Sequence, residues 1–375
     1  MARPSRAVLL GSLGLLAWSQ AGYPLALAAW TRAGGARPWR PGPGGTPQDP
    51  PPSVALVVAA HDEAAVIAAK VANALAQDYP PGRLEVVVTD DASTDGTPEL
   101  AEAAGAHRVL RNPRGGKVRA QDAAVRATDA EVVAFSDANA MWEPGALRAL
   151  VAPFADPGVG LVCGRVSFTR AGGGTNQEGL YWRYEMWLRG LESGLGSVTA
   201  GNGAIYAVRR PAYVEVDPVM GHDLKLPFTL VKAGWRCVEA PGARATEPMV
   251  PSVDGEIARK RRMMSHAWPI VVRGGLLDPR GLGPRDVLFL ASHRVLRYLG
   301  PFLHLAALGA SLRASRPLLA LQLAGAALAA AGGRAGRPGL LARYYAGTQA
   351  SIALGLYDWL RHGTQAGWDA AEGTR

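Results

Sequence analysis

The sequence predicts an α/β domain, doubly wound around a largely parallel sheet and flanked on both sides by membrane helices. From Ser53 onward, apolar runs of strand length alternate with helical segments. These runs lack the apolar and polar alternation of a sheet with one solvated face, so helices are expected to cover both faces. Long apolar stretches near both ends of the chain predict the membrane helices.

Runs rich in Val, Ala and Phe are the expected strands, and they cover residues 54–60, 84–89, 131–136, 159–166 and 205–209. Helices are expected at 64–77, 97–104 and 144–154. The helix at 97–104 has the clearest start. Thr97 is a favoured N-cap, Pro98 suits the first helical position, and Glu99 suits the first turn.

An uncharged, Leu-rich run over residues 7–30 is long enough to cross a bilayer as one helix. A cleaved signal peptide is the alternative, but its apolar region is usually only about 7–15 residues long. Apolar blocks at 287–312, 317–331 and 340–360 predict two or three further spans. His293, Arg294 and Arg297 interrupt the first block, so its opening half is expected to lie along the membrane interface.

These features divide the chain into five segments. They are an N-terminal transmembrane anchor (1–33), a Pro/Gly linker (34–52), the α/β domain (53–270), C-terminal membrane helices (271–362) and a tail (363–375). Arg residues follow the first apolar run and separate the last two, which the positive-inside rule assigns to the cytosolic side. We therefore expect an integral protein of the inner cell membrane with a cytosolic α/β domain.

The composition limits the partners. The net charge of +9 comes mostly from Arg that gathers beside apolar segments. This placement favours anionic lipid and nucleotide phosphates as partners and argues against nucleic acid. The chain has two cysteines, Cys163 and Cys237, without the spacing of a zinc site or a disulfide framework, so a reducing compartment is expected.

Acidic side chains follow the first three expected strands of the sheet core. They are Asp62 and Glu63, then Asp91, then Asp137 with Asn139 two residues later. Each alone is compatible with a turn or a helix cap, but ligands of open α/β sheets bind beyond the carboxyl ends of the strands. Asp137 and Asn139 offer hard oxygen ligands for Mg²⁺ or Mn²⁺, which would neutralise a diphosphate leaving group.

A basic glycine turn, RGGK, ends in Lys117. Its backbone and the lysine side chain are suited to approach a phosphate or a uracil ring. The alternative is an ordinary solvated surface turn.

The runs ALVVAAHDEAAVI, VVVTDDASTDGTPEL, RGGK and VVAFSDAN together resemble the GT-A domain of family 2 glycosyltransferases, which include cellulose, hyaluronan and poly-N-acetylglucosamine synthases. The resemblance extends from about Ser53 to Trp268. It implies a hexosyl- or N-acetylhexosaminyltransferase with a nucleotide diphosphate sugar as donor, expected to be a UDP-sugar, and a carbohydrate or lipid-linked acceptor.

The resemblance also implies roles for the strand-end residues. Asp91 would contact uracil, and Asp62 with Glu63 would form the opening acidic turn, where Asn is commoner than Asp62. The metal-binding DxD matches Asp137 and Asn139, so the second carboxylate is an amide here. Asn keeps an oxygen ligand but loses a charge, which should weaken metal binding.

The run MGHDLKLPFTL resembles the segment of the catalytic base and matches it at Asp223, with His222 where an acid is more usual. The expected role is to take the proton from an acceptor hydroxyl that attacks the anomeric carbon opposite the diphosphate, which gives inversion. A helix N-cap is the alternative for Asp223. Gly201, Asn202 and Gly203 resemble the family's acceptor-side turn, although an ordinary tight turn has the same composition.

The run EIARKRRMMSHAW lacks the QxxRW motif of processive synthases, and its nearest cations include Arg259 and Arg262. They are suited to clamp the donor diphosphate or to bind anionic lipid headgroups. A single-sugar transferase is therefore preferred to a processive polysaccharide synthase. A catalytically silent nucleotide-binding scaffold is the other alternative. Three short helices would make a thin channel unless copies or a partner subunit associate.

Overall fold

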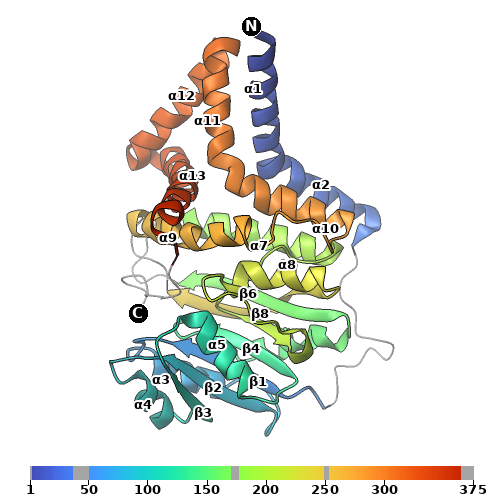
Figure 1. The fold of residues 1–375 in the computed structure, drawn as a ribbon, viewed down its shortest axis with the longest axis vertical. Helices are drawn as coiled ribbons and strands as arrows, with labels where there is room; N and C mark the ends of the chain where they lie inside the picture. The colour runs from blue at the N-terminus through green and yellow to red at the C-terminus, as the bar shows by residue number, and fades with distance from the viewer. Residues whose placement is uncertain (1, 37–49, 170–176, 249–252, 365–375) are drawn as a thin grey trace.

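A computed structural model describes residues 2–36, 50–169, 177–248 and 253–364, and it consists of three layers (Figure 1). One mixed sheet of eight strands lies at the base, in the order β3-β2-β1-β4-β7-β6-β8-β5. Helices cross above one edge of the sheet, and a group of upright helices rises from them. The strands are β1 (Val54–Ala60), β2 (Leu84–Asp91), β3 (Arg108–Asn112), β4 (Val132–Asp137), β5 (Met141–Trp142), β6 (Val159–Thr169), β7 (Tyr206–Arg209) and β8 (Arg236–Pro248).

Five helices belong to the sheet domain and pack against it: α3 (Ile67–Leu75), α4 (Thr97–Ala103), α5 (Lys117–Arg126), α6 (Ala146–Val151) and α8 (His222–Lys232). Alternate residues of β1 enter two separate cores, with Leu56 and Val58 on one face and Val57 on the other. All seven residues of β1 are buried. Burial on both faces explains the continuous apolar runs, and the predicted α/β architecture is confirmed.

The parallel arrangement that the sequence predicts holds for β3, β2, β1 and β4, but β7 runs antiparallel to β4 and to β6. The cause is the path of the chain. After β6 it forms α7 (Gln177–Leu195) and reaches the sheet again at the carboxyl edge of β4, where Ser136 Oγ donates to the carbonyl of Ala204 at 3.2 Å. A strand that starts at the carboxyl end of β4 and pairs with it must run antiparallel to it.

All three predicted helix starts are shifted, and the helix expected from residue 144 begins at Ala146. The helix expected from residue 64 begins at Ile67, because a turn occupies the preceding residues. Gly96, with φ of 86°, is the N-cap of α4, so Thr97 is the first helical residue. Its hydroxyl donates to Asp95 Oδ1 at 2.5 Å. Glycine takes this left-handed conformation without steric cost, which explains the one-residue error.

The crossing layer consists of α2 (Tyr23–Trp30), α7, α9 (Val253–Val272) and α10 (Pro284–Phe289), and the upright group consists of α1 (Ala2–Ala17), α11 (Leu296–Ala314) and α12 (Arg316–Ala331) (Figure 1). The last helix, α13 (Gly336–His362), packs on α9 and α12. Exposed leucines gather on the upright helices and α13, an apolar surface of the kind that marks a contact with a membrane or another protein: Leu10, Leu305, Leu312, Leu321 and Leu360.

Within the described residues, two helical segments are long and apolar enough to cross a bilayer, Pro284–Ala314 and Arg316–His362. The second contains a break at Gly332 (φ 54°), which separates α12 from α13. The predicted helix at 7–30 is two helices, α1 and α2, joined by a widened turn over Trp18–Gly22. Its role as a membrane anchor stays a prediction.

The basic residues that interrupt the first C-terminal block lie in a buried polar network. Glu192 of α7 accepts a hydrogen bond from Tyr23 of α2 at 2.8 Å and pairs with His293 Nδ1 at 2.7 Å. Glu185, also on α7, pairs with Arg294 at 3.2 Å and with Arg297 at 2.6 Å. These ion pairs compensate charges that burial would otherwise make costly, and they attach the start of the first long apolar helix to the layer above the sheet.

Candidate active site

The carboxyl ends of β1, β2 and β4 meet at one edge of the sheet. Ala60 at the end of β1 is opposite Asp90 of β2, and Ala59 is opposite Asp137 of β4. The parallel register therefore places Asp91 and Asp137 on either side of the end of β1. This edge lies beneath the crossing layer, where α9 and α7 approach the sheet (Figure 1).

Asp91 organises the RGGK turn. Its Oδ1 accepts from the backbone N–H groups of Gly115 and Gly116 at 2.7 and 3.0 Å, and its Oδ2 accepts from Arg114 at 3.0 Å. Gly116 has a φ of 91°, which only glycine adopts readily, and α5 begins at the next residue, Lys117. The buried Asp91 carboxylate thus fixes where Lys117 points.

Lys117 crosses from the turn to β4 and forms an ion pair with Asp137. Burial opposes the charge of Lys117, but the Asp137 carboxylate outweighs it and holds the pKa of Lys117 above its ordinary value. Gly203 closes over this pair. A Cβ there would be 3.2 Å from Lys117 Nζ and 3.3 Å from Asp137 Oδ2. Three residues from separate motifs therefore meet at one point.

The metal-ligating prediction fits this edge only in part. Asp137 ends β4 and Asn139 follows two residues later, both partly buried. Among the described residues no group of three or more His, Cys, Asp or Glu side chains is arranged to hold a metal ion. Mg²⁺ and similar ions commonly use one or two carboxylates together with substrate phosphates. The donor set therefore fits a cation that is completed by the donor.

Asp223 occupies the first turn of α8 and is exposed. Gly221 is the N-cap of this helix, so Asp223 does not cap it. Its backbone carbonyl accepts a hydrogen bond from the N–H of Gly201 at 2.7 Å. The backbone of the residue that resembles a catalytic base is thus hydrogen-bonded to the turn that resembles an acceptor turn.

The turn at Gly201 to Gly203 is held rigidly. Asn202 donates to the carbonyl of Gly164 at 2.8 Å and accepts from the N–H of Ile205 at 2.9 Å. Arg189, a buried residue of α7, donates to the carbonyl of Gly201 at 3.0 Å. An ordinary solvated turn does not need this support.

The other predicted donor residues make the following contacts. Asp62, with a left-handed φ of 52°, accepts from the N–H of Thr94 at 2.8 Å. Glu63 is buried, and its N–H donates to Thr97 at 2.8 Å. On α9, Arg259 pairs with Glu256 at 2.7 Å, whereas Arg262 is exposed.

Sequence reasoning missed two charged residues at this edge. Glu247 lies near the end of β8, and burial together with the Asp137 carboxylate raises the pKa of Glu247 to about 7. Lys70 of α3 is fully buried, donates to the carbonyl of Ala140 at 2.6 Å and lies over the ring of Trp142. Burial lowers the pKa of Lys70 to about 7. Neither position could be predicted from the sequence. Glu247 lies in a strand that contains Pro and Gly, and Lys70 follows alanines in a helix without a motif.

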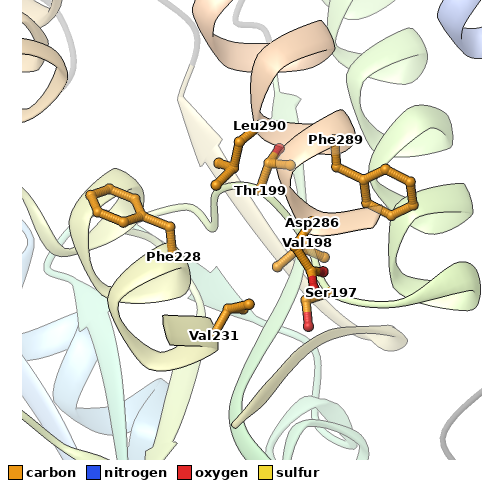
Figure 2. Close-up of a pocket in the computed structure, with 8 residues that line it drawn as sticks. All are labelled: Ser197, Val198, Thr199, Phe228, Val231, Asp286, Phe289 and Leu290. Atoms are coloured by element: carbon orange, nitrogen blue, oxygen red, sulfur yellow. The ribbon is translucent and has the colours of Figure 1, made fainter. Parts of the chain in front are cut away.

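A small pocket lies elsewhere, between α8, the segment before the Gly201 turn, and the start of the first long apolar helix (Figure 2). Phe228, Val231, Phe289 and Leu290 supply most of its side chains, and Asp286 is a charged residue among its lining. It contains none of the carboxylates at the strand ends. We therefore place the candidate site at the sheet edge.

Comparison with known proteins agrees with this geometry. Residues 55–215 match the model of glycosyl transferase family 2. A β-monoglucosyldiacylglycerol synthase of Nostoc sp. is 32% identical over 197 residues, which cover 49% of this chain and 42% of that protein. Glycosyltransferase AglE of Haloferax volcanii is 24% identical over 221 residues, 56% of this chain and 71% of that one. The chain thus spans less than half the length of the synthase.

A solved structure extends the similarity beyond the sheet domain to the long apolar helices. Mannosyltransferase PcManGT of Pyrobaculum calidifontis, in complex with GDP-Man and Mn²⁺, is 25% identical. The match covers 95% of this chain and 97% of that one, with a TM-score of 0.71. Residues 55–215 thus resemble a glycosyltransferase family 2 domain, and the chain has the GT-A-type fold of its structural neighbours.

Proposed function

We propose that this protein is an inverting, metal-dependent glycosyltransferase that moves a sugar from a nucleotide diphosphate donor to a lipid-linked or carbohydrate acceptor at a membrane. One observation carries the proposal. Lys117, Asp137 and Gly203 meet at the carboxyl edge of the sheet, and Asp223 is hydrogen-bonded through its backbone to the turn that contains Gly203. This arrangement supports a site in which a cation, a proposed metal ligand and a proposed base lie around one point.

On the donor side, Asp137 and Asn139 would hold a divalent cation, which supplies Lewis-acid neutralisation of the leaving diphosphate when it is bound. Lys117 would then leave the Asp137 carboxylate and contact the diphosphate, since its flexible chain ends at the same point. Arg259 and Arg262 on α9 are candidates for further phosphate contacts.

On the acceptor side, Asp223 is the proposed base. Its carboxylate takes the proton of an acceptor hydroxyl while that oxygen bonds to the anomeric carbon, and the bond between this carbon and the diphosphate oxygen breaks. Attack opposite the leaving group inverts the configuration. The exposed position of Asp223 suits contact with an incoming acceptor.

A lipid acceptor is favoured by two observations. The sheet edge lies directly beneath the crossing helices that carry the apolar upright group (Figure 1). In addition, the Nostoc relative is named for glucosyl transfer to diacylglycerol. The nucleotide base is open between uracil and guanine, because the mannosyltransferase structure contains GDP-Man whereas the sequence favours a UDP-sugar.

The test is a transfer assay with purified protein in vesicles that contain diacylglycerol or a lipid phosphate, with Mn²⁺ and either UDP-glucose or GDP-mannose. Mass spectrometry of the extracted lipids should detect a hexose added by one donor. The Asp223→Asn protein is the matched control. If a wider panel of nucleotide sugars also gives no transfer to lipid or soluble carbohydrate, the chain is a nucleotide-binding scaffold and the proposal fails.

A further inference from the structure

We propose that His222 is a positioning residue for the base. The proposal rests on the function above, because it assigns His222 to the support of Asp223. His222 belongs to a buried ring cluster, defined as Phe135, Tyr206, Tyr213 and His222. The proposed mechanism uses none of these rings, yet all four pack directly behind the site.

The ring cluster is closely packed. Phe135 and Tyr206 are stacked with ring centroids 4.8 Å apart, and the His222 ring meets both of them edge-on at 5.9 and 6.3 Å. The ring of Tyr213 closes the other side at 5.8 Å. His222 is only 5% exposed. The imidazole therefore has one well-defined position.

Two hydrogen bonds hold the ring within the cluster, a long one of 3.5 Å between the Tyr213 hydroxyl and His222 Nε2 and a shorter one to Tyr206. The Tyr206 hydroxyl and His222 Nδ1 are 2.9 Å apart and both side chains are buried. If the Tyr206 hydroxyl is removed, His222 Nδ1 is left as an unsatisfied polar atom in a dry environment, and if His222 is removed, Tyr206 loses its bond to Nδ1 and keeps only its contact with Gln121. Each substitution is therefore expected to move the ring of its partner.

Three of the four rings lie close in sequence to different parts of the site. Phe135 precedes Asp137 by two residues, Tyr206 follows Gly203 by three, and His222 directly precedes Asp223. Gln121, one helical turn after Lys117 on α5, lies beside Tyr206. The ring cluster thus connects the metal ligand, the acceptor turn, the lysine and the base.

At the base, the Asp223 carboxylate accepts a hydrogen bond from the N–H of Leu224 at 3.0 Å, and the backbone of this segment is held from two sides. The His222 ring holds the start of α8 from the sheet side, and the N–H of Gly201 binds the Asp223 carbonyl from the acceptor side. If the contact of the His222 ring is lost, only the hydrogen bond from Gly201 still holds the Asp223 backbone. A displacement of about 1 Å at a reacting group is enough to lower turnover by roughly a hundredfold.

Two variants test the proposal. His222→Leu keeps a side chain of similar size but removes the imidazole side of the hydrogen bond, and Tyr206→Phe removes the hydroxyl side. Each should lower kcat tenfold or more while donor KM and nucleotide affinity stay within twofold. His222→Asn places an amide near the Nδ1 position and should restore a large part of the lost rate. Tyr79→Phe is the control, because it removes a hydroxyl that donates to Pro52 in the same domain, away from the site.

Combination with Asp223→Asn separates positioning from a general structural role. Without the Asp223 carboxylate there is no base to position, so adding His222→Leu should cost no further rate. The positioning proposal is overturned if the double variant loses the product of the two single-variant losses in kcat. It is also overturned if His222→Leu keeps a normal kcat while Asp223→Asn is slow. In both cases the base assignment survives. If Asp223→Asn itself keeps normal turnover, the proposed base is wrong and the positioning proposal fails with it.

Discussion

Acid should destabilise this protein through His222. Burial, and next the ammonium of Lys117, lowers the pKa of His222 to about 3, whereas the imidazole of an unfolded chain titrates near its ordinary value of about 6.5. Between these values the unfolded chain binds a proton that the folded protein does not. The stability that neutral His222 provides is therefore complete above pH 6.5 and is lost as the pH falls toward 3.

The size of the effect follows from the two pKa values. Between pH 7 and pH 5 the free energy of unfolding should fall by about 2 kcal/mol from this group alone. For a domain of about 200 residues this corresponds to roughly 4–8 °C in Tm. The assay is thermal unfolding of detergent-solubilised protein, followed by tryptophan fluorescence at both pH values.

A non-titrating variant isolates the contribution of His222 from those of other groups. His222→Asn should start from a lower Tm at pH 7 and lose less on acidification than the wild type, by about the same 4–8 °C. The control is His362→Asn, which removes an exposed imidazole at the end of α13 and should behave as the wild type does. Equal losses in the wild type and the His222→Asn protein would show that His222 is not held neutral, and the reasoning would be refuted.

Four further predictions concern activity. Asp223→Asn should keep nucleotide binding but lower kcat by roughly a hundredfold or more, measured by initial rates of transfer; near-normal turnover would remove the base assignment. Activity should require a divalent cation and should be lost in Asp137→Ala, so full activity in excess chelator would contradict the metal role. Gly203→Ala should raise the donor KM by about tenfold, because its Cβ would displace Lys117 or Asp137; an unchanged KM would show that the pair tolerates the methyl group. Arg262→Ala should raise donor KM or slow transfer without changing product length, and mass-spectrometric sizing after prolonged reaction should find short products; polymers of many tens of sugars would indicate a processive synthase.

The sequence was sufficient to predict the sheet core, because strands buried on both faces produce continuous apolar runs. Residues 54–60 were predicted with the bounds that β1 has. The edge strand β3 and the long β8 were missed. β3 is short and partly exposed, and β8 contains a Pro and a Gly in a run without periodicity. The antiparallel β7 was also beyond sequence reasoning, since strand direction depends on where the preceding helix returns the chain.

The candidate site was predictable where local motifs coincide with strand ends, as at Asp91 and Asp137. The roles of Asp91 and Asp137 remain predictions, but the sheet places both residues at the same edge, on either side of the end of β1. Contacts between segments that are far apart in the chain could not be predicted from local sequence patterns. Glu247 and Lys70 approach Asp137 only after β8 and α3 are folded against the sheet. His222 appeared as a departure from the family pattern, and its ring contacts explain why a neutral side chain is accommodated there.

The anomeric configuration of the product tests the central claim most directly. With an α-linked nucleotide sugar that the assay identifies as the donor, the product should be isolated after a single transfer and its anomeric proton examined by NMR. A base opposite the leaving diphosphate predicts a β-linked sugar. An α-linked product would show that the configuration is retained, which in-line displacement with Asp223 as the base cannot give.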